Sequence, residues 1–203
     1  MRPDGHLPRG QWWRRLAAAL VLAASLPGQA QAPSAGALQL RIEGAFLVNF
    51  VRYTEWPAQR FAGPGSPYQV SVVGDADAAS AIAAVATAAG TIRGRRIVVR
   101  PVRFDARMTA AARRESIRQL RDSHLVFVAG GEAADARLVL RAVRDAPVLT
   151  VSDVPGFAAG GGMLGLVRSG RTLAIEANPA AIRASGISVS AKVLKLARLW
   201  GGK

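Results

Sequence analysis

The sequence predicts an α/β fold: a single three-layer domain in which helices cover both faces of a largely parallel sheet. Short apolar runs of strand length alternate with longer helical segments from residue 68 to residue 151, an order typical of parallel sheets. The run at 125–129 (LVFVA) is almost wholly apolar, as expected of a central strand buried on both faces. After residue 160 the alternation stops, and two strands joined by Ser169-Gly170 predict a C-terminal β-hairpin, followed by helices.

The predicted elements follow one another with short connections. A helix is expected over 38–53, and Trp56-Pro57 ends it. Its expected buried stripe consists of Ile42, Ala45, Phe46, Asn49, Phe50 and Tyr53. Further strands are expected at 68–73, 96–102, 125–129, 147–151, 163–167 and 172–177. Further helices are expected at 76–89, 109–121 and 132–144, from Asn178-Pro179 onward, and at 188–200.

The first 32 residues have the pattern of a secretory signal peptide. Four arginines precede the apolar run 16–26, and Ala30-Gln31-Ala32 offers a small-x-small cleavage site. An apolar run of 11 residues is shorter than the roughly 20 that span a bilayer. We therefore expect a signal peptide at 1–32, a short tether at 33–37 and the α/β domain at 38–203, with export to the periplasm. An uncleaved anchor is the alternative interpretation.

The chain is basic and contains no cysteine. Residues 33–203 carry 23 basic and 12 acidic side chains, a net charge of +11. Ten of the basic residues lie between Arg93 and Arg121, which favours either a solvated basic face or attraction to anionic lipid or an acidic partner. The export signal argues against a nucleic-acid partner. The lack of cysteine excludes thiol catalysis, cysteine-ligated metals and disulfides.

Two motifs resemble catalytic signatures but lack their context. Residues 160–165 (GGGMLG) satisfy G-x-G-x-x-G, yet they lead into a strand rather than a helix, so a glycine turn is expected instead of a nucleotide site. Ser152, Asp153 and His124 are the residue types of a hydrolase triad, but no G-x-S-x-G surrounds the serine. No His or Glu pair has metal-ligand spacing. We expect no catalytic residue, no metal and no cofactor.

A candidate ligand site lies where the fourth predicted strand ends. Ser152 and Asp153 come at the carboxyl end of that strand, the edge at which open α/β sheets bind ligands. Arg171 and Glu176 follow on the hairpin, on opposite faces if the strand is regular. A polar pocket could combine Ser152 and Asp153 with one of these two. The alternative is a buried loop in which Asp153 caps backbone amides.

A candidate partner interface follows the first predicted helix. Tyr53, Trp56 and Phe61 lie within nine residues of one another, and aromatic side chains are frequent anchors of protein interfaces. The alternative is that these rings pack the helix against the sheet.

Several segments, in order and with their spacing, resemble the YfiR family over residues 38–200. They are 45–50 (AFLVNF), 53–57 (YTEWP), 72–75 (VVGD), 94–99 (GRRIVV), 149–153 (LTVSD), 156–157 (GF), 161–164 (GGML), 175–178 (IEAN), 187–188 (IS) and 194–197 (LKLA). The resemblance implies a periplasmic α/β protein that binds the sensor region of an inner-membrane diguanylate cyclase and represses it. Cyclic di-GMP and biofilm formation would then fall. The best-studied branch uses disulfides for redox control, which this chain lacks.

The sequence therefore favours a non-catalytic periplasmic regulator that binds a diguanylate cyclase or another membrane sensor protein. Two alternatives stay open: a periplasmic module that binds a small polar ligand, and a hydrolase that uses Ser152. The oligomeric state is not determined, and a homodimer is compatible with the sequence.

Overall fold

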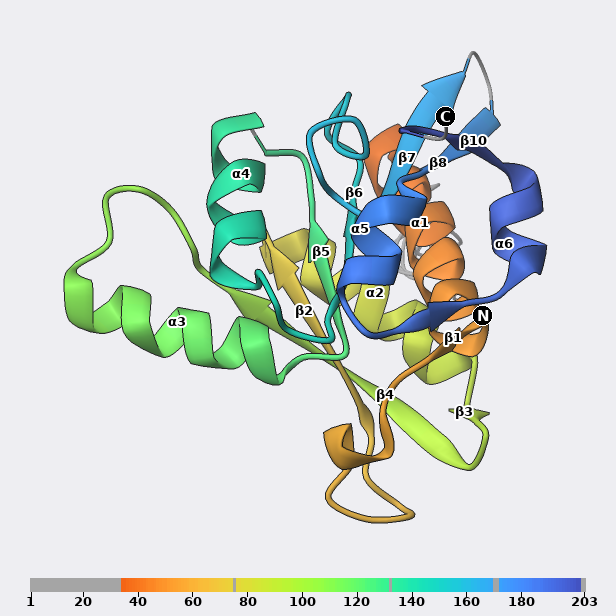
Figure 1. Cartoon of the computed structure of the whole chain (residues 1–203), viewed down its shortest axis with the longest axis horizontal. Helices are drawn as coiled ribbons and strands as arrows, with labels where there is room; N and C mark the ends of the chain where they lie inside the picture. The colour runs from red at the N-terminus through yellow and green to blue at the C-terminus, as the bar shows by residue number, and fades with distance from the viewer. Residues whose placement is uncertain (1–33, 75, 132, 170–171, 202–203) are drawn as a thin grey trace, which may run out of the picture. The chain divides into compact units, whose positions relative to one another are not determined.

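The computed structural model describes residues 34–74, 76–131, 133–169 and 172–201. The expected signal peptide, 1–32, lies outside these residues. Within the described part of the chain, the main sheet has eight strands in the order β10-β8-β7-β6-β5-β2-β4-β3 (Figure 1). These strands are β2 (Tyr68–Val73), β3 (Thr91–Ile92), β4 (Arg95–Val102), β5 (Leu125–Val128), β6 (Leu149–Ser152), β7 (Leu164–Ser169), β8 (Thr172–Ala177) and β10 (Ala197–Leu199).

The centre of the sheet is parallel and its two edges are mixed. The five central strands, β4, β2, β5, β6 and β7, run parallel to one another. Strand β8 returns antiparallel beside β7 and forms the predicted hairpin. Strand β10 lies parallel to β8 at one edge, and β3 lies antiparallel to β4 at the other. A separate two-stranded sheet pairs β1 (Thr54–Glu55) with β9 (Ser188–Val189).

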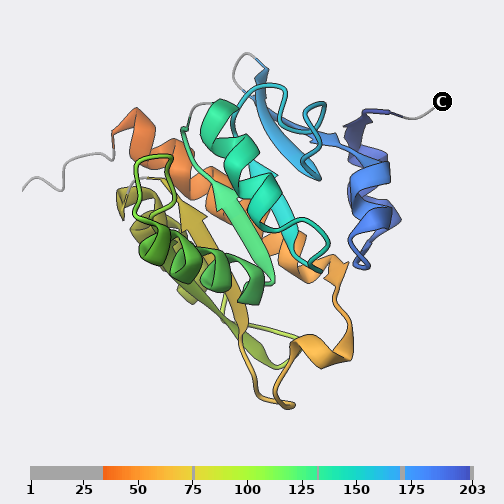
Figure 2. The same ribbon diagram turned by 60° about the vertical axis from the view of Figure 1, so that its left-hand side comes forward.

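Helices cover both faces of the sheet, and each face has its own apolar core. Helices α1 and α2 lie on one face, and α3 and α4 lie on the other (Figure 2). Alternate strand residues serve the two cores: Phe127 points into the first and Val128 into the second, as the two-residue period of a strand requires. The helices are α1 (Ala35–Arg52), α2 (Ala76–Ala88), α3 (Ala110–Asp122), α4 (Ala133–Ala142), α5 (Pro179–Ala184) and α6 (Ala191–Leu196), with a 3-10 turn η2 (Ala58–Arg60).

In the described ranges, we find no helix with the length and apolar character needed to cross a membrane.

The predicted three-layer α/β fold is confirmed, and most elements begin and end within two residues of their expected positions. The capping signals act as expected. Thr109 accepts a hydrogen bond from Ala112 N at the start of α3, and Asn178 accepts one from Ala181 N at the start of α5.

The prediction of a single helix over 188–200 is wrong. The segment is divided into strand β9, the six-residue helix α6 and strand β10. Without β10, strand β8 would expose its backbone N–H and C=O groups at the edge of the sheet. The backbone of 197–199 pairs with that edge from Ile175 to Ala177, and Trp200 N donates to Ala177 O at 2.8 Å. Pairing with a distant strand therefore replaces the local helical preference.

The face of α1 that meets the sheet also differs from the expected stripe. Residues Glu43, Leu47 and Val51 are buried, whereas Ile42, Ala45 and Asn49 are exposed. The helix begins at Ala35, inside the expected tether, with Ser34 Oγ accepting from Ala37 N at 3.2 Å. Because α1 has apolar residues on both sides, periodicity alone could not select the buried side.

Candidate functional site

Ser152, the first residue of the expected ligand site, forms its side-chain hydrogen bonds with backbone groups. It ends β6 and is 0% exposed. Its hydroxyl donates to Val128 O at 2.8 Å and accepts from Val154 N at 3.0 Å. The first bond holds the end of β6 against β5, and the second fixes the direction of the loop that follows. A hydroxyl used in this way stabilises the loop.

Asp153 likewise connects two loops at the carboxyl end of the sheet. One carboxylate oxygen, Oδ1, accepts from Gly130 N at 2.8 Å, and Gly130 follows β5. This contact matches the alternative expectation that Asp153 caps a backbone amide. Arg171, the cationic candidate for the same pocket, lies outside the described residues.

Glu176 lies in one row with Ser152, across the intervening strand. Ser152 pairs with Gly165 of β7, and Gly165 pairs with Glu176 of β8. Since neighbouring strands are about 4.8 Å apart, the two Cα atoms are separated by about 10 Å. A Cβ on Gly165 would lie 3.4 Å from Glu176 Cβ, so the glycine leaves room for this 7% exposed carboxylate. Glu176 Oε2 has no hydrogen-bond partner among the described residues.

The structure adds a buried acid that the sequence analysis did not identify. Glu43 of α1 is 0% exposed, and its Oε1 accepts from Gln39 Nε2 at 2.8 Å. Arg168 of β7 donates in turn to Gln39 Oε1. Burial raises the pKa of Glu43, and the negative charge of Asp153 raises it further. The hydrogen bond from Gln39 and the positive charge of Arg168 lower it, but burial is the largest effect. The signal in the sequence was the position of Glu43, four residues before Leu47, on the face of α1 that is buried.

These groups do not form a hydrolase triad. His124 directly precedes β5, while Ser152 ends β6 and pairs with Val128 at the other end of β5. Because four residues separate these positions along β5, at about 3.3 Å per residue, His124 and Ser152 lie about 13 Å apart along the sheet. Proton transfer needs contact of about 3 Å. Within the described ranges, no group of three or more His, Asp or Glu side chains could hold a metal ion.

Trp56 and Phe61, both expected to form a partner interface, belong to an aromatic cluster at the amino end of the sheet. The Trp56 side chain is only 8% exposed, and Nε1 donates to His124 O at 2.9 Å. Its ring centroid lies 5.6 Å from those of Tyr68 and His124. Phe61 stacks on His124 at 4.5 Å, with the Arg95 guanidinium 4.1 Å from its centroid. Trp56 therefore packs in the core.

His124 is held neutral within this cluster. It is 3% exposed, and its Nδ1 accepts from Gln69 N at 3.0 Å. Burial lowers the pKa of His124 to about 4, and the charges of Arg60 and Arg95 act in the same direction. Tyr53, the third expected interface residue, is half-buried at the end of α1, and Lys192 Nζ lies 5.9 Å from its ring centroid.

The glycine run before β7 forms a packed turn. The Phe157 ring lies against Gly162, where an added Cβ would come within 2.2 Å of the ring. Gly162 N donates to Phe157 O at 2.9 Å, and Gly161 has a φ of +103°. The turn leads into a strand, as expected, and does not form the strand-to-helix junction of a dinucleotide site.

The outer face of α1 is a partly apolar surface, and it includes Ile42, Ala45, Phe46 and Asn49 from the stripe that was expected to be buried. Leu38 is 51% exposed and Ile42 is 44% exposed. Together with Arg41, Ala45, Phe46 and Asn49, they line a shallow groove of about 520 Å³. We call these six residues the α1 outer face. Large apolar side chains exposed on one helix are a common feature of binding surfaces.

Comparison with known families identifies the fold and its class. The model of the YfiR/HmsC-like family matches residues 40–198, which includes almost all of the described chain. The chain belongs to the YfiR/HmsC-like family. At the level of this family, its members are periplasmic regulators of diguanylate cyclases. The resemblance of the short segments in the sequence is thereby confirmed.

A solved structure agrees with the fold of this YfiR/HmsC-like chain. The crystal structure of a conserved domain protein from Vibrio cholerae O1 biovar El Tor matches with a TM-score of 0.53 and 12% identity. The match covers 79% of this chain and 59% of that one, so this chain spans less than two thirds of that protein. No curated protein matches the chain at significant similarity.

Proposed function

We propose that this protein is a non-catalytic periplasmic repressor that binds the periplasmic sensor region of an inner-membrane diguanylate cyclase. The observation that carries this proposal is the family match over residues 40–198. Repression would lower cyclic di-GMP and biofilm formation. The same family match supports export, and the expected signal peptide supports it independently.

The arrangement of the described residues supports a binding role. The hydroxyl of Ser152 and one carboxylate oxygen of Asp153 already bond to the backbone, and His124 lies at the opposite end of the sheet. The α1 outer face offers exposed apolar side chains, among them Leu38 and Ile42. Apolar anchors surrounded by polar residues are typical of protein interfaces. We therefore place the cyclase contact on the α1 outer face, in place of Trp56.

The test combines recovery of the partner with a cellular readout. The full-length chain with a C-terminal tag is expressed in its own host, cross-linked in intact cells and purified from membranes. We expect a diguanylate cyclase to be recovered, and deletion of the gene to raise cyclic di-GMP. Failure to recover any membrane protein with folded, exported bait would contradict the proposal.

The interface is tested by Ile42→Glu. A charge in place of an apolar anchor typically costs about 2 kcal/mol or more, so recovery of the cyclase should fall roughly 30-fold. Ala111→Glu on the exposed face of α3 is the matched control, because it adds the same charge to another helix. Equal recovery with both variants would exclude the α1 outer face as the contact.

A further inference from the structure

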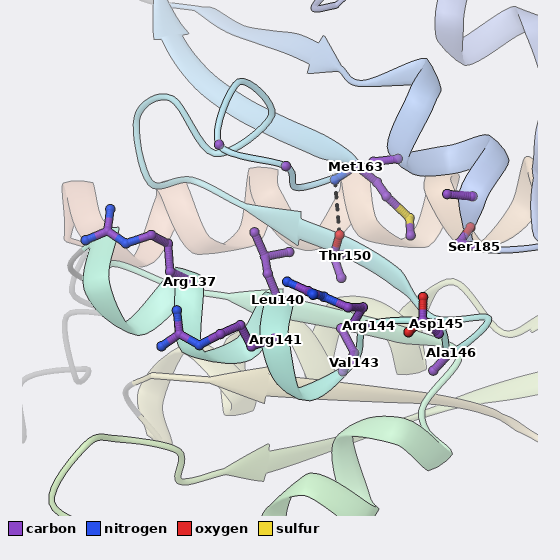
Figure 3. A pocket seen from close by; sticks show the side chains of 14 residues that line it. Arg137, Leu140, Arg141, Val143, Arg144, Asp145, Ala146, Thr150, Met163 and Ser185 are labelled. Atoms are coloured by element: carbon purple, nitrogen blue, oxygen red, sulfur yellow. Dashed lines mark hydrogen bonds between the residues drawn. The ribbon is translucent and has the colours of Figure 1, made fainter.

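A further hollow lies between α4, α5 and the glycine turn before β7 (Figure 3). Its volume is about 380 Å³, which is within the usual range of small-molecule sites. It is lined by Arg137, Leu140, Arg141, Val143, Arg144, Asp145, Ala146, Thr150, Gly160, Gly161, Met163, Ala181, Ala184 and Ser185. We call it the α4–α5 cavity.

Three arginines line this cavity, two on α4 and one in the turn that follows it. Arg137 and Arg141 are four residues apart on α4, a spacing that places them on one side of the helix. Arg144 lies in the turn after α4 ends at Ala142. All three are exposed, and among the described residues none forms an ion pair. In Figure 3, Arg137 and Arg141 lie at one end, and Arg144 extends back along α4 towards Leu140. Asp145 is the one acid in the lining, so the cavity is strongly electropositive.

The floor of the cavity is apolar. Val143, Ala146 and Met163 are 5, 5 and 8% exposed. Met163 N donates to Thr150 Oγ1 at 3.1 Å, which holds the end of the glycine turn against β6. Leu140 completes the floor from the α4 side. An apolar floor below several positive charges is complementary to a molecule that has both an apolar body and an acidic group.

We propose that the α4–α5 cavity binds a small amphiphilic anion, a molecule with one carboxylate, phosphate or sulfonate group on an apolar body. The apolar body would lie on Leu140, Val143 and Met163, and the acidic group would accept hydrogen bonds from the arginines. An inorganic anion would leave the apolar floor uncovered, and a neutral ligand would leave the arginines unpaired. The cavity contains no aromatic side chain among its lining residues, so base stacking of a nucleic acid has no platform there.

This site goes beyond the proposed function and is separate from the expected ligand site. The α4–α5 cavity opens beside Thr150 and the turn at Asp145, whereas Ser152 and Asp153 lie at the carboxyl end of the sheet. Its test therefore does not depend on any cyclase.

The test uses two dyes with the same apolar body on the purified protein. The anionic probe is 8-anilinonaphthalene-1-sulfonate, and the neutral probe is N-phenyl-1-naphthylamine, which lacks the sulfonate. We expect one site that binds the sulfonate at least tenfold more tightly. Arg137→Gln, Arg141→Gln and Arg144→Gln should each weaken sulfonate binding about three- to tenfold, the effect of one partly exposed charge-assisted hydrogen bond. Arg114→Gln, on the exposed side of α3, is the control and should leave the affinity unchanged.

A second pair of variants tests the place of binding. Ala184 is exposed and lines the cavity, so Ala184→Phe should fill it and weaken sulfonate binding more than tenfold without lowering the melting temperature. Ala180→Phe adds the same ring at another exposed position of α5, outside the lining, and should have no effect.

Competition separates the two sources of such an anion. Displacement of the sulfonate by sodium decanoate below its micelle concentration supports a free organic acid, and displacement only by phosphatidylglycerol vesicles supports a lipid headgroup. The proposal is overturned if neither competes, if both dyes bind equally, or if a variant that combines Arg137→Gln, Arg141→Gln and Arg144→Gln binds the sulfonate like the wild type.

Discussion

Replacing Trp56 with alanine separates a core role from an interface role. The side chain is 8% exposed, contacts Tyr68 and His124 through its ring, and donates to His124 O at 2.9 Å. The same carbonyl accepts a second hydrogen bond from Leu149 N at 2.9 Å. Loss of the indole N–H therefore does not leave His124 O unpaired, and the cost comes mainly from the cavity.

The expected loss of stability can be worked from this burial. A buried tryptophan removes on the order of 200 Å² from water, worth about 5 kcal/mol as an upper estimate. Tryptophan-to-alanine changes in cores typically cost about 3–5 kcal/mol. For a domain of this size we expect the melting temperature to fall by roughly 6–20 °C.

The assay is urea unfolding of the purified protein followed by far-ultraviolet circular dichroism, with repression of cyclic di-GMP measured in parallel. Tyr53→Ala is the matched control. Tyr53 is half-buried against the edge of the core, so a smaller loss of about 1–2 kcal/mol is expected. A Trp56→Ala protein that keeps wild-type stability to within about 1 kcal/mol and still fails to repress would refute the core assignment.

Two further predictions concern buried packing, at His124 beside Trp56 and at Gly162 beside Phe157. The pKa of His124 is lowered from 6.5 to about 4. As the pH falls, the unfolded chain therefore takes up the proton first, and stability that is present above pH 6.5 is lost as the pH approaches 4. Linkage gives a loss of about 2 kcal/mol in the free energy of unfolding between pH 7 and pH 5. His124→Asn retains an acceptor for Gln69 N and should flatten this dependence in urea titrations; an unchanged slope would show that another group titrates. Gly162→Ala would place a Cβ 2.2 Å from the buried Phe157 ring and should destabilise the protein by about 1–3 kcal/mol in thermal melts. Gly63→Ala, with no atom within 4 Å of the added Cβ, is its control, and equal melting of the two variants would contradict the packing argument.

The parts of the structure that the sequence predicted are those fixed by local signals. Strand β2 occupies the residues expected from its apolar run, and Thr109 and Asn178 cap the helices that they were expected to cap. The hairpin of β7 and β8 followed from two short runs around a turn. Each of these signals lies within a few residues of the element that it specifies.

The candidate sites were predicted less well because burial and pairing are not local properties. Ser152 and Glu176 do share one row, but only the register through Gly165 places them there. The sequence leaves open whether Trp56 is an interface anchor or a core residue, and only the packing of His124 and Tyr68 around its ring shows that it is buried. The α4–α5 cavity combines segments far apart in the sequence, and no motif marks it.

The sequence by itself determined the alternation of strands and helices, the capped helix ends and the resemblance to the YfiR family. The tertiary structure decided which side of α1 is buried, because that helix is apolar on both sides and only the packing of Leu47 and Val51 against the sheet distinguishes them. It also decided that 197–199 form a strand, because the free edge of β8 offers hydrogen bonds that a helix end cannot. Both outcomes depend on contacts between residues that are distant in the chain.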